Sequence, residues 1–496
     1  MSRNPADGGR GSVAGARSAS TSVESNRPRH GLPRPHRLGA REGGPRHLTV
    51  LGGGITGLAA GYYARRHGLP VTVYEAQRRP GGLSVTFSHD GFLFDSGAHR
   101  FHDKDPAITR DVRAVLGEDL RAVSRPSMIF DGGRLLPFPF RLPDVLRHLG
   151  PGELARGVLD LAAVRIAGRA PGSESFAGLA TRRYGRAIAA RFLLGYSRKL
   201  WGLPGESLST RVSGGRLQGL DLRQFLRDTL LGRSADRRSV DGTFYYPTRG
   251  IGMVAEALAR GCGPQGVRTS TEVGRLHHDG AWIRSIAVPG VGDRIPVDTL
   301  ASTLPIERLL AMMDPPPPAH VLRLAHDLKH RDLVLVALFL RKESVTDAAT
   351  VYFPDPGVPF TRVTEPRNRS EAMSPPGYTS LVAEIPCEAE DPLWSTDDAH
   401  LVGITVKPLE QVGWIRGGEL VGSRVVRLRH AYPVLSLGFE RSLEGVLRYL
   451  GGFGNLTLAG RNGRFEYGWI HGMLRSGKNL VASCVEGSTG TGSGVA

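Results

Sequence analysis

The chain has 496 residues, 40% of them hydrophobic and 22% charged, which is the composition of a globular protein with two or three domains. Its formal net charge of +17 would suit a nucleic-acid partner. However, more than a third of the excess positive charge lies in residues 1–46, and the rest forms no run of lysines. We therefore expect no nucleic-acid partner. Three scattered cysteines and the lack of an apolar run of about 18 residues argue against disulfides, structural zinc and a spanning helix, and indicate a cytoplasmic protein.

Residues 1–46 are rich in glycine, serine and proline and hold nine arginines against three acids. With almost no large apolar side chains, this tail cannot bury enough surface to offset the entropy of ordering, and we expect it to be disordered. It has no apolar central region of the kind that a secretory signal needs. We therefore expect it to be a dispensable extension or the result of an upstream start codon.

A strand, turn, helix and second strand are predicted within residues 47–75. Residues 48–51 suit a buried parallel strand, and residues 71–74 suit the second. The glycine-rich turn between them lets a pyrophosphate approach a helix N-terminus, and Glu75 can accept the hydroxyl protons of a ribose. The predicted dinucleotide contacts are Gly52, Gly53, Gly54, Thr56, Gly57 and Glu75.

The loop after this unit helps to identify the cofactor. Arg79 and the paired glycines Gly81 and Gly82, followed by Leu83, are not what a nicotinamide dehydrogenase requires. A plain turn before the next strand is one interpretation. The segment also resembles the flavoprotein family of amine oxidases, protoporphyrinogen oxidases and UDP-galactopyranose mutases. This resemblance implies that the cofactor is FAD and that the loop follows its pyrophosphate.

Residues 91–102, GFLFDSGAHRFH, alternate as a strand and break at Gly97, where the backbone can pass close to a flat ring system. His99 and His102 are three residues apart, but no further cluster supports a metal, and a hydrogen-bonded or surface pair is the plainer interpretation. The segment resembles the GGHRFF or GPHxFH segment of UDP-galactopyranose mutase-like flavoproteins. That resemblance implies that Gly97, Ala98 and His99 lie against the isoalloxazine.

Asp131 and Gly132 predict a hairpin turn between short apolar strands. The prolines at 137, 139 and 143 then favour an exposed edge. We interpret this edge as an ordinary crossover between domains, with an apolar lid over the substrate and a membrane-facing loop as alternatives. Residues 151–191 have helical periodicity and are expected to begin a substrate or cap domain.

Residues 196–204, YSRKLWGLP, combine the rings of Tyr196 and Trp201 with the charge of Arg198. Such a group can stack a base or hold a phosphate or carboxylate, although on chemistry alone a core tryptophan is the simpler interpretation. The segment resembles the YTxKxWG motif of the mutase-like group, with serine in place of threonine. That resemblance implies contacts with the nucleotide part of a substrate.

Further segments resemble the same family. Residues 245–252, YYPTRGIG, match its YPxGGxG segment and precede a predicted helix at 253–260. Val273, in a predicted strand with Glu272, stands where family members touch the FAD adenine. Residues 300–310 resemble the strand and turn that close this lobe, before a proline linker.

The region 321–432 should return to the substrate domain. We expect strands at 333–340 and 351–353 and a long loop at 354–378. Tyr432 lies in an AYPV segment that resembles the family's, which implies a place at the border of the active site.

Residues 456–474 are the last recognisable segment. A predicted strand ends at Gly460, and Arg461 opens a turn arranged as a second phosphate contact, with GRNG matching the family. Where mutase-like members commonly continue RYNNQDHSM, this chain has FEYGWIHGM. The aligned residues are Tyr467, His471 and Met473, and the replacements of polar residues beside the flavin are Gly468, Trp469 and Gly472. The departure leaves FAD binding intact and weakens the case for the mutase reaction.

We therefore predict an α/β fold with a Rossmann-like, doubly wound FAD-binding domain and an inserted, mixed α+β substrate domain. The FAD-binding domain should comprise residues 47–120, 245–315 and 450–490, and the substrate domain residues 121–244 and 316–449.

The first functional hypothesis is an oxidoreductase that passes hydride from a small sugar, amine or natural product to flavin N5, with His99 or His471 as base or orienting group. The second is a nucleotide-sugar mutase, in which reduced N5 attacks an anomeric carbon without net redox. A flavin scaffold or membrane-surface protein is a weaker third. The predicted substrate contacts are Tyr196, Arg198, Trp201, Tyr432 and Tyr467, and no metal is expected.

Overall fold

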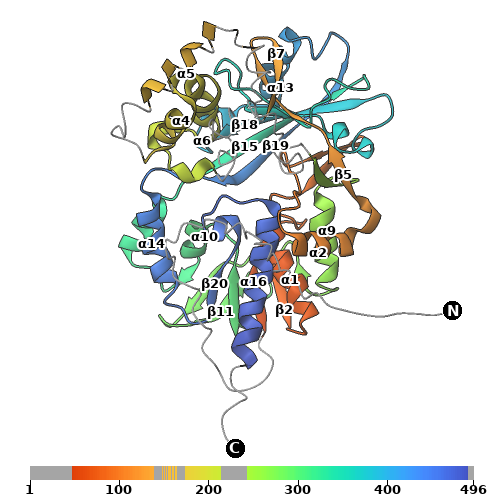
Figure 1. The fold of residues 1–496 in the computed structure, drawn as a ribbon. Coiled ribbons are helices and arrows are strands. Elements are labelled where there is room, and N and C mark those ends of the chain that lie inside the picture. The colour runs from red at the N-terminus through yellow and green to blue at the C-terminus, as the bar shows by residue number, and fades with distance from the viewer. Residues whose placement is uncertain are drawn as a thin grey trace, which may run out of the picture. The chain divides into compact units, whose positions relative to one another are not determined.

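The computed structural model describes residues 47–138, individual positions between 148 and 164, residues 174–213 and residues 243–489. The tail 1–46, Pro139, Pro143 and part of the segment predicted to be helical at 151–191 lie outside the described residues. The elements that are described gather around two large sheets, one below and one above in Figure 1.

The lower sheet is parallel, has five strands and takes the order β20-β13-β1-β2-β9. Its strands are β1 (Leu48–Leu51), β2 (Val71–Tyr74), β9 (Val267–Arg268), β13 (Thr299–Ser302) and β20 (Leu456–Leu458). Three distant stretches of chain thus build one sheet, with β1 in the middle. Every residue of β1 is buried, which explains why three of its four residues are apolar. The Rossmann-like arrangement predicted from the sequence is confirmed.

Four helices share an apolar core with this sheet. They are α1 (Ile55–Arg66), α2 (Pro106–Leu116), α9 (Gly252–Gly261) and α16 (Ile470–Thr489). Helices α1 and α16 pack so closely that a Cβ atom added to Gly477 would lie 2.5 Å from the carbonyl oxygen of Thr56. The C-terminal helix therefore holds the N-terminal half of α1 in place.

A four-stranded sheet of order β12-β11-β10-β14 is joined to the same lobe. The side chain of Asn455, just before β20, accepts from the Ile283 backbone N–H at 2.9 Å and donates to its carbonyl at 2.8 Å. The strands are β10 (Arg275–His278), β11 (Ile283–Val288), β12 (Gly292–Pro296) and β14 (Met313–Asp314). The neighbouring helices are α10 (Ile306–Ala311), α11 (Ala319–His326) and α14 (Phe439–Leu450).

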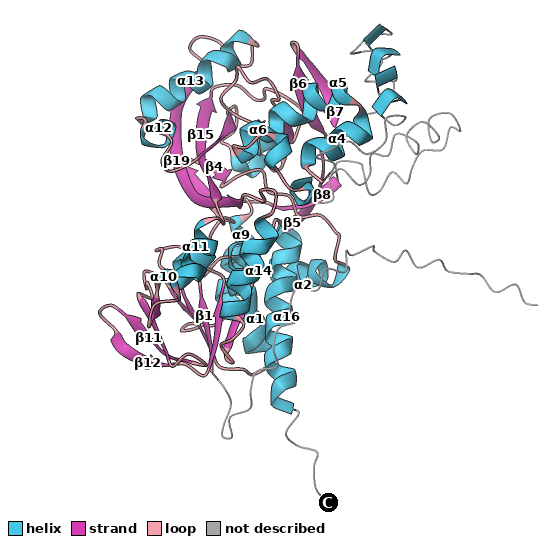
Figure 2. Ribbon diagram, turned by 90° about the vertical axis from the view of Figure 1, so that its left-hand side faces the viewer, coloured by secondary structure: helices cyan, strands magenta, loops and turns pink. Residues whose placement is uncertain are grey.

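The upper sheet has seven strands in the order β19-β15-β18-β17-β16-β6-β7. They are β19 (Leu420–Pro433), β15 (His330–Leu340), β18 (Thr379–Cys387), β17 (Arg362–Thr364), β16 (Thr350–Tyr352), β6 (Ser127–Asp131) and β7 (Arg134–Phe138). Apolar residues of the long strands share a core with α13 (Asp398–Gln411). The helices α4 (Phe176–Tyr184) and α6 (Gly195–Trp201) lie near the same sheet (Figure 2).

Shorter elements complete the fold. Two antiparallel pairs connect the lobes, β3 (Thr86–His89) with β4 (Phe92–Asp95) and β5 (Leu120–Ser124) with β8 (Thr243–Pro247). The remaining short helices are α5 (Arg186–Ile188), α12 (Pro392–Ser395) and α15 (Gly460–Gly463), with a π-helical turn at Ala189–Leu194.

The predicted hairpin is confirmed, but its two turn residues are Gly132 and Gly133, because Asp131 ends β6 and pairs with Arg134. The second strand, β7, forms an edge of the upper sheet and contains Pro137. Two local predictions are wrong. In the described stretch between β9 and β10, Glu272 and Val273 are not a strand, because the flanking backbone N–H groups of Thr271 and Gly274 bond to two different segments. The loop predicted at 354–378 contains β17, which pairs with β16 and β18.

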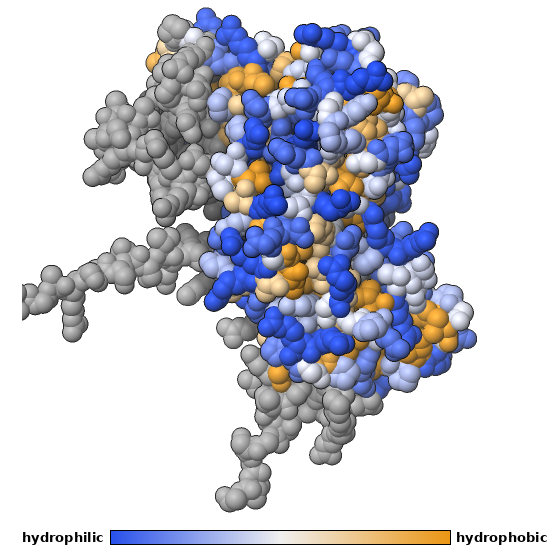
Figure 3. All heavy atoms as spheres, turned by 90° about the vertical axis from the view of Figure 1, so that its right-hand side faces the viewer, coloured by the Kyte–Doolittle hydropathy of each residue, from blue (hydrophilic) through white to orange (hydrophobic). Residues whose placement is uncertain are grey.

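None of the described helices combines the length and the apolar character that crossing a membrane requires. The large apolar side chains that are exposed among the described residues come from separate elements, for example Leu135 of β7, Leu322 of α11 and Val421 of β19. On the face drawn in Figure 3, apolar residues lie in small groups among polar ones.

Candidate active site

The glycine-rich turn between β1 and α1 has the shape of a phosphate cradle. A Cβ atom on Gly57 would lie 2.0 Å from the carbonyl oxygen of Gly52, so only glycine fits there. A Cβ atom on Gly54 would approach nothing closer than the Cα of Gly82 at 4.0 Å, which leaves open space at the turn. The described helix α1 has no side-chain cap and no acid in its first turn, so its N-terminal amides are available to an anion.

The loop after β2 closes this cradle. The Gly81 N–H donates to the Gly53 carbonyl at 2.8 Å, and Gly54 and Gly81 form a parallel bridge. Arg79 is exposed, with its guanidinium carbon 5.5 Å from the centroid of the Phe87 ring. Gly460 approaches from the C-terminal segment, where an added Cβ would lie 2.9 Å from Thr56 Oγ1. Residues far apart in sequence therefore converge on the N-terminus of α1.

A cleft of about 590 Å³ opens on one side of the turn, lined by Gly52, Glu75, Val273 and Leu304 among others. The buried carboxylate of Glu75 accepts from the backbone N–H groups of Gly53 and Gln77, both at 2.8 Å. These bonds fix the carboxylate at the end of β2, where a ribose can reach it. The residues fit the adenosine half of a dinucleotide.

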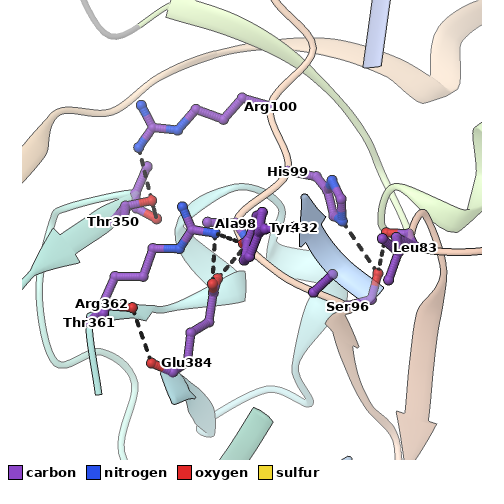
Figure 4. Close-up of polar contacts among 12 residues, drawn as sticks. Leu83, Ser96, Ala98, His99, Arg100, Thr350, Thr361, Arg362, Glu384 and Tyr432 are labelled. Carbon is purple, nitrogen blue, oxygen red and sulfur yellow. Dashed lines mark hydrogen bonds and ion pairs between the residues drawn. The ribbon is translucent and has the colours of Figure 1, made fainter. Parts of the chain in front are cut away.

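A second cleft, of about 640 Å³, contains most of the residues predicted to lie near the flavin ring. The predicted residues that line it are Leu83, Gly97, Ala98, His99, Tyr432, Arg461 and Tyr467. Gly97 has φ +143°, a conformation that side chains rarely adopt, and lies beside the carboxylate of Glu384. The Ala98 N–H donates to that carboxylate at 2.8 Å (Figure 4).

A buried ion pair lies beside the segment that contains Gly97 and Ala98. Arg362 of β17 and Glu384 of β18 approach to 2.7 Å, and Arg362 donates to the hydroxyl of Tyr432 at 2.8 Å. Although burial lowers the pKa of Arg362, the Glu384 carboxylate holds it well above its usual value. Burial raises the pKa of Tyr432 to about 12, so this phenol stays protonated at neutral pH. Figure 4 shows these three side chains converging below Ala98.

His99 is neutral at physiological pH. Burial lowers its pKa to about 3, with help from Arg461, Arg369 and Arg362. Its Nε2 atom lies 3.3 Å from the hydroxyl of Ser96, which itself donates to the Leu83 carbonyl at 2.7 Å. A histidine with such a low pKa is a weak base near pH 7, so this geometry favours the orienting role over the base role.

Other predicted residues lie away from the two clefts. Trp201 is 3% exposed and packs edge-on against Tyr432 and Tyr467, with ring centroids 6.0 and 5.5 Å away. Tyr196 packs edge-on against Tyr352, and Arg198 is exposed. None of these three lines the described flavin cleft. Trp201 therefore supports two tyrosines of the cleft from behind.

The two predicted residues of α16 also lie outside the cleft lining. Met473 belongs to the apolar core beneath α1. His471 is half-buried, and burial together with Lys104 lowers its pKa. The structure does not bring His471 to the side chains that surround His99.

Sequence reasoning missed several residues of the flavin cleft. Arg100 and Arg362 line it beside Arg461, so three arginines contribute to the wall of one cleft. Trp469 and Gly468, which the family resemblance already placed beside the flavin, line it too, at the point where the chain departs from the mutase pattern. An arginine inside the strand-like run FTRVT was the available signal, but strand β17 was taken for part of a loop.

One cleft is lined by Gly52 of the glycine-rich turn and by the Glu75 carboxylate, and the other lies beside Gly97, a glycine with positive φ. Together with the glycine-rich turn, these features fit a protein that binds a dinucleotide. The amino-acid sequence matches the family of flavin-containing amine oxidoreductases over residues 55–484. The chain belongs to this family, and its cofactor is FAD.

The curated relatives are distant. The coproporphyrinogen III oxidase of Bacillus subtilis (strain 168) is 22% identical over 442 residues, which cover 81% of this chain and 90% of that protein. The chloroplastic protoporphyrinogen oxidase of Oryza sativa subsp. japonica is 30% identical over 184 residues, but the match spans only 34% of that protein and 35% of this chain.

Solved structures share the fold over nearly the whole chain. A reduced UDP-galactopyranose mutase superposes with a TM-score of 0.77 at 23% identity, covering 90% of this chain and 96% of the mutase. Wild-type putrescine oxidase bound to putrescine superposes with a TM-score of 0.59 at 18% identity, covering 89% and 99%. Mutases and oxidases thus share this architecture, and the fold alone does not distinguish their reactions.

Proposed function

We propose that the protein is an FAD-dependent oxidoreductase that accepts hydride from a small anionic substrate. The observation that carries this proposal is the cleft wall formed by Arg100, Arg362 and Arg461. Guanidinium groups recognise carboxylates and phosphates through paired hydrogen bonds. FAD, when bound, supplies N5 as the hydride acceptor.

The chain's own residues have separate parts in this proposal. Gly52, Gly54 and Glu75 hold the adenosine and pyrophosphate end, and Gly97 and Ala98 lie along the ring. Neutral His99, which is bonded to Ser96, has an orienting role in the wall of the cleft. The arginines fix the anionic group of the substrate. The indole of Trp469, which packs edge-on against His102 with ring centroids 5.3 Å apart, helps to exclude water from the reacting centre.

Two features support oxidation over isomerisation. The residues that differ from the mutase pattern, Gly468 and Trp469, belong to the cleft lining. The relatives matched by sequence are named as porphyrinogen oxidases, and a polycarboxylate substrate of that kind would suit three arginines.

A nucleotide-sugar mutase is the second candidate. Its support is the high structural similarity to UDP-galactopyranose mutase, because three arginines also suit a diphosphate. In that case Tyr432 and Tyr467, backed by Trp201, would provide the aromatic wall for the nucleotide or sugar.

Anaerobic flavin spectroscopy separates the two candidates. The oxidised, FAD-loaded enzyme is mixed with coproporphyrinogen III, protoporphyrinogen IX, putrescine and UDP-galactopyranose, and the flavin absorbance is followed. Bleaching by a substrate supports the oxidoreductase. The mutase proposal would replace the oxidoreductase proposal if the photoreduced enzyme converted the nucleotide sugar without net flavin oxidation and no compound bleached the oxidised flavin.

Two arginine variants test the anionic substrate. Arg100→Gln should raise KM for the substrate identified above by about tenfold or more, because it removes the charge from the cleft and leaves the flavin contacts in place. Arg198→Gln is the matched control, since Arg198 is exposed and does not line the cleft. Equal KM values in the two variants would argue against the arginine wall.

A further inference from the structure

A second group of polar side chains meets where the two lobes touch. Glu307 comes from α10, His330 begins β15 and His430 lies in β19. Glu307 Oε1 is 3.4 Å from His330 Nδ1 and 3.3 Å from His430 Nε2. One ligand atom from each residue lies within 4.8 Å of the other two. None of the three lines the described flavin cleft.

The two distances from Glu307 Oε1 match the distance between neighbouring ligand atoms in a metal complex. Hydrogen bonds from nitrogen to oxygen are usually about 2.7–3.2 Å long, so both contacts are long for direct bonds. In a tetrahedral zinc site with ligand bonds of about 2.05 Å, neighbouring ligand atoms are about 3.3 Å apart. The two distances from Glu307 Oε1 already have this value.

Two buried atoms of the cluster have polar needs that the described residues do not meet. Glu307 Oε2 and His330 Nε2 are buried and have no hydrogen-bond partner there. The side chain of His330 is 4% exposed and is packed edge-on by His430 and Phe465, each with a centroid distance of 5.1 Å. Of the two ring nitrogens of His330, Nδ1 is therefore the one that meets a polar atom, and that atom is Glu307 Oε1.

The backbone holds His430 in place for this role. The register of β15 and β19 shifts between Arg331 and Leu333, so Asp332 pairs with Cys387 of β18 but with no residue of β19. Its carboxylate instead accepts from the His430 N–H at 2.7 Å, and His430 adopts φ +54°. A bulge of this kind re-aims a side chain, here toward Glu307.

We propose that Glu307, His330 and His430 bind one divalent first-row transition-metal ion, with zinc as the best match. Two imidazoles and a carboxylate are a recurrent ligand set for such ions. The side chains of Glu307 and His430 are 36% and 33% exposed, so the ion can enter and keep water in its remaining position. The ligands lie 23 and 100 residues apart in sequence, which is why no metal motif was visible there.

The ion would also connect the lobes and support the flavin cleft. It would tie α10 to β15 and β19. The carbonyls of the same bulge bind the short helix α15, since Ala431 accepts from Arg461 at 2.9 Å and His430 accepts from Asn462 at 3.3 Å. Fixing His430 therefore helps to fix Arg461, which lines the cleft.

Zinc titration of the full-length, tag-free, FAD-loaded protein tests the site. After treatment with a chelator, equilibrium dialysis against Zn²⁺ should give one tightly bound zinc per chain. Glu307→Gln and His430→Asn should weaken zinc binding by more than about tenfold, since even indirect contacts to metal ligands have effects of that size. Asparagine is chosen because it tolerates positive φ. His400→Gln, at an exposed histidine of α13, should bind zinc like the parent.

Thermal melting provides a second measurement that does not depend on activity. The zinc-free variants should retain FAD and melt as one species, and zinc should raise the melting temperature of the parent and of His400→Gln but not of the two ligand variants. Failure of the folded parent to bind zinc, or equal zinc affinity in Glu307→Gln and the parent, would overturn the proposal.

Discussion

Replacing Arg362 with methionine should strongly destabilise the protein. The side chain of Glu384 is 1% exposed, and without Arg362 its carboxylate would keep the hydrogen bond from the Ala98 N–H but lose its ion pair. Removing one partner of a buried ion pair costs about 3–5 kcal/mol, because the remaining charge stays buried without compensation. The carboxylate would also draw a proton or pull away from Ala98, which would disturb this part of the cleft wall.

The expected shift in melting temperature follows from the size of the protein. An unfolding entropy of about 2.1 cal/mol/K per residue gives about 0.8 kcal/mol/K for roughly 400 ordered residues. The loss of about 3–5 kcal/mol then corresponds to a fall of about 4–6 °C. The measurement is thermal unfolding followed by flavin fluorescence, at equal total FAD for all variants because bound cofactor itself raises the melting temperature.

Two further variants make this test specific. Arg362→Met combined with Glu384→Gln removes both charges and should recover part of the loss, because a neutral amide is less costly to bury than an unpaired carboxylate. Arg198→Met, at an exposed position, should melt within about 1 °C of the parent. A single Arg362→Met variant that melts within about 1 °C of the parent would refute the reasoning, as would a double variant no more stable than the single one.

Three other predictions concern the cofactor and the cleft. Gly57→Ala should lower FAD retention and the melting temperature, because its Cβ would lie 2.0 Å from the Gly52 carbonyl oxygen. The control Gly403→Ala in α13, where a Cβ meets nothing within 4 Å, should be neutral or slightly stabilising. Equal FAD content in the two variants would contradict this prediction. Glu75→Gln should weaken FAD binding by about tenfold in a titration of the apoprotein, because the amide loses charge and one acceptor, and an unchanged affinity would remove Glu75 from the ribose site. Burial lowers the pKa of His99 to about 3, so as the pH falls below about 6.5 the unfolded chain gains a proton before the folded protein does. The free energy of unfolding should therefore decrease between pH 6.5 and pH 3, by up to about 1.4 kcal/mol per pH unit. His99→Gln should flatten this part of the plot of melting temperature against pH, and parallel plots for variant and parent would show that His99 is not responsible.

The sequence by itself determined the nucleotide-binding turn. Gly52, Gly57 and Glu75 act within one strand–helix–strand unit, so their spacing is imposed by local geometry and can be recognised along the chain. The hairpin at Asp131 and Gly132 was predictable for the same reason, since a two-residue turn between paired strands needs positive φ at both positions, here Gly132 and Gly133. FAD could be inferred because the segments that resemble its family follow one another in the expected order.

Only the tertiary structure decided which side chains surround the reacting end of the cofactor. Arg362 reaches Glu384 and Tyr432 because β17 pairs with β18 and lies within the same sheet as β19, and no local pattern encodes that strand order. Trp201 was expected to contact the substrate, yet its burial behind two tyrosines depends on where α6 packs. Glu307, His330 and His430 meet only because a bulge in β19 faces α10. Contacts set by strand register and lobe packing join residues whose separation along the chain carries no signal of its own.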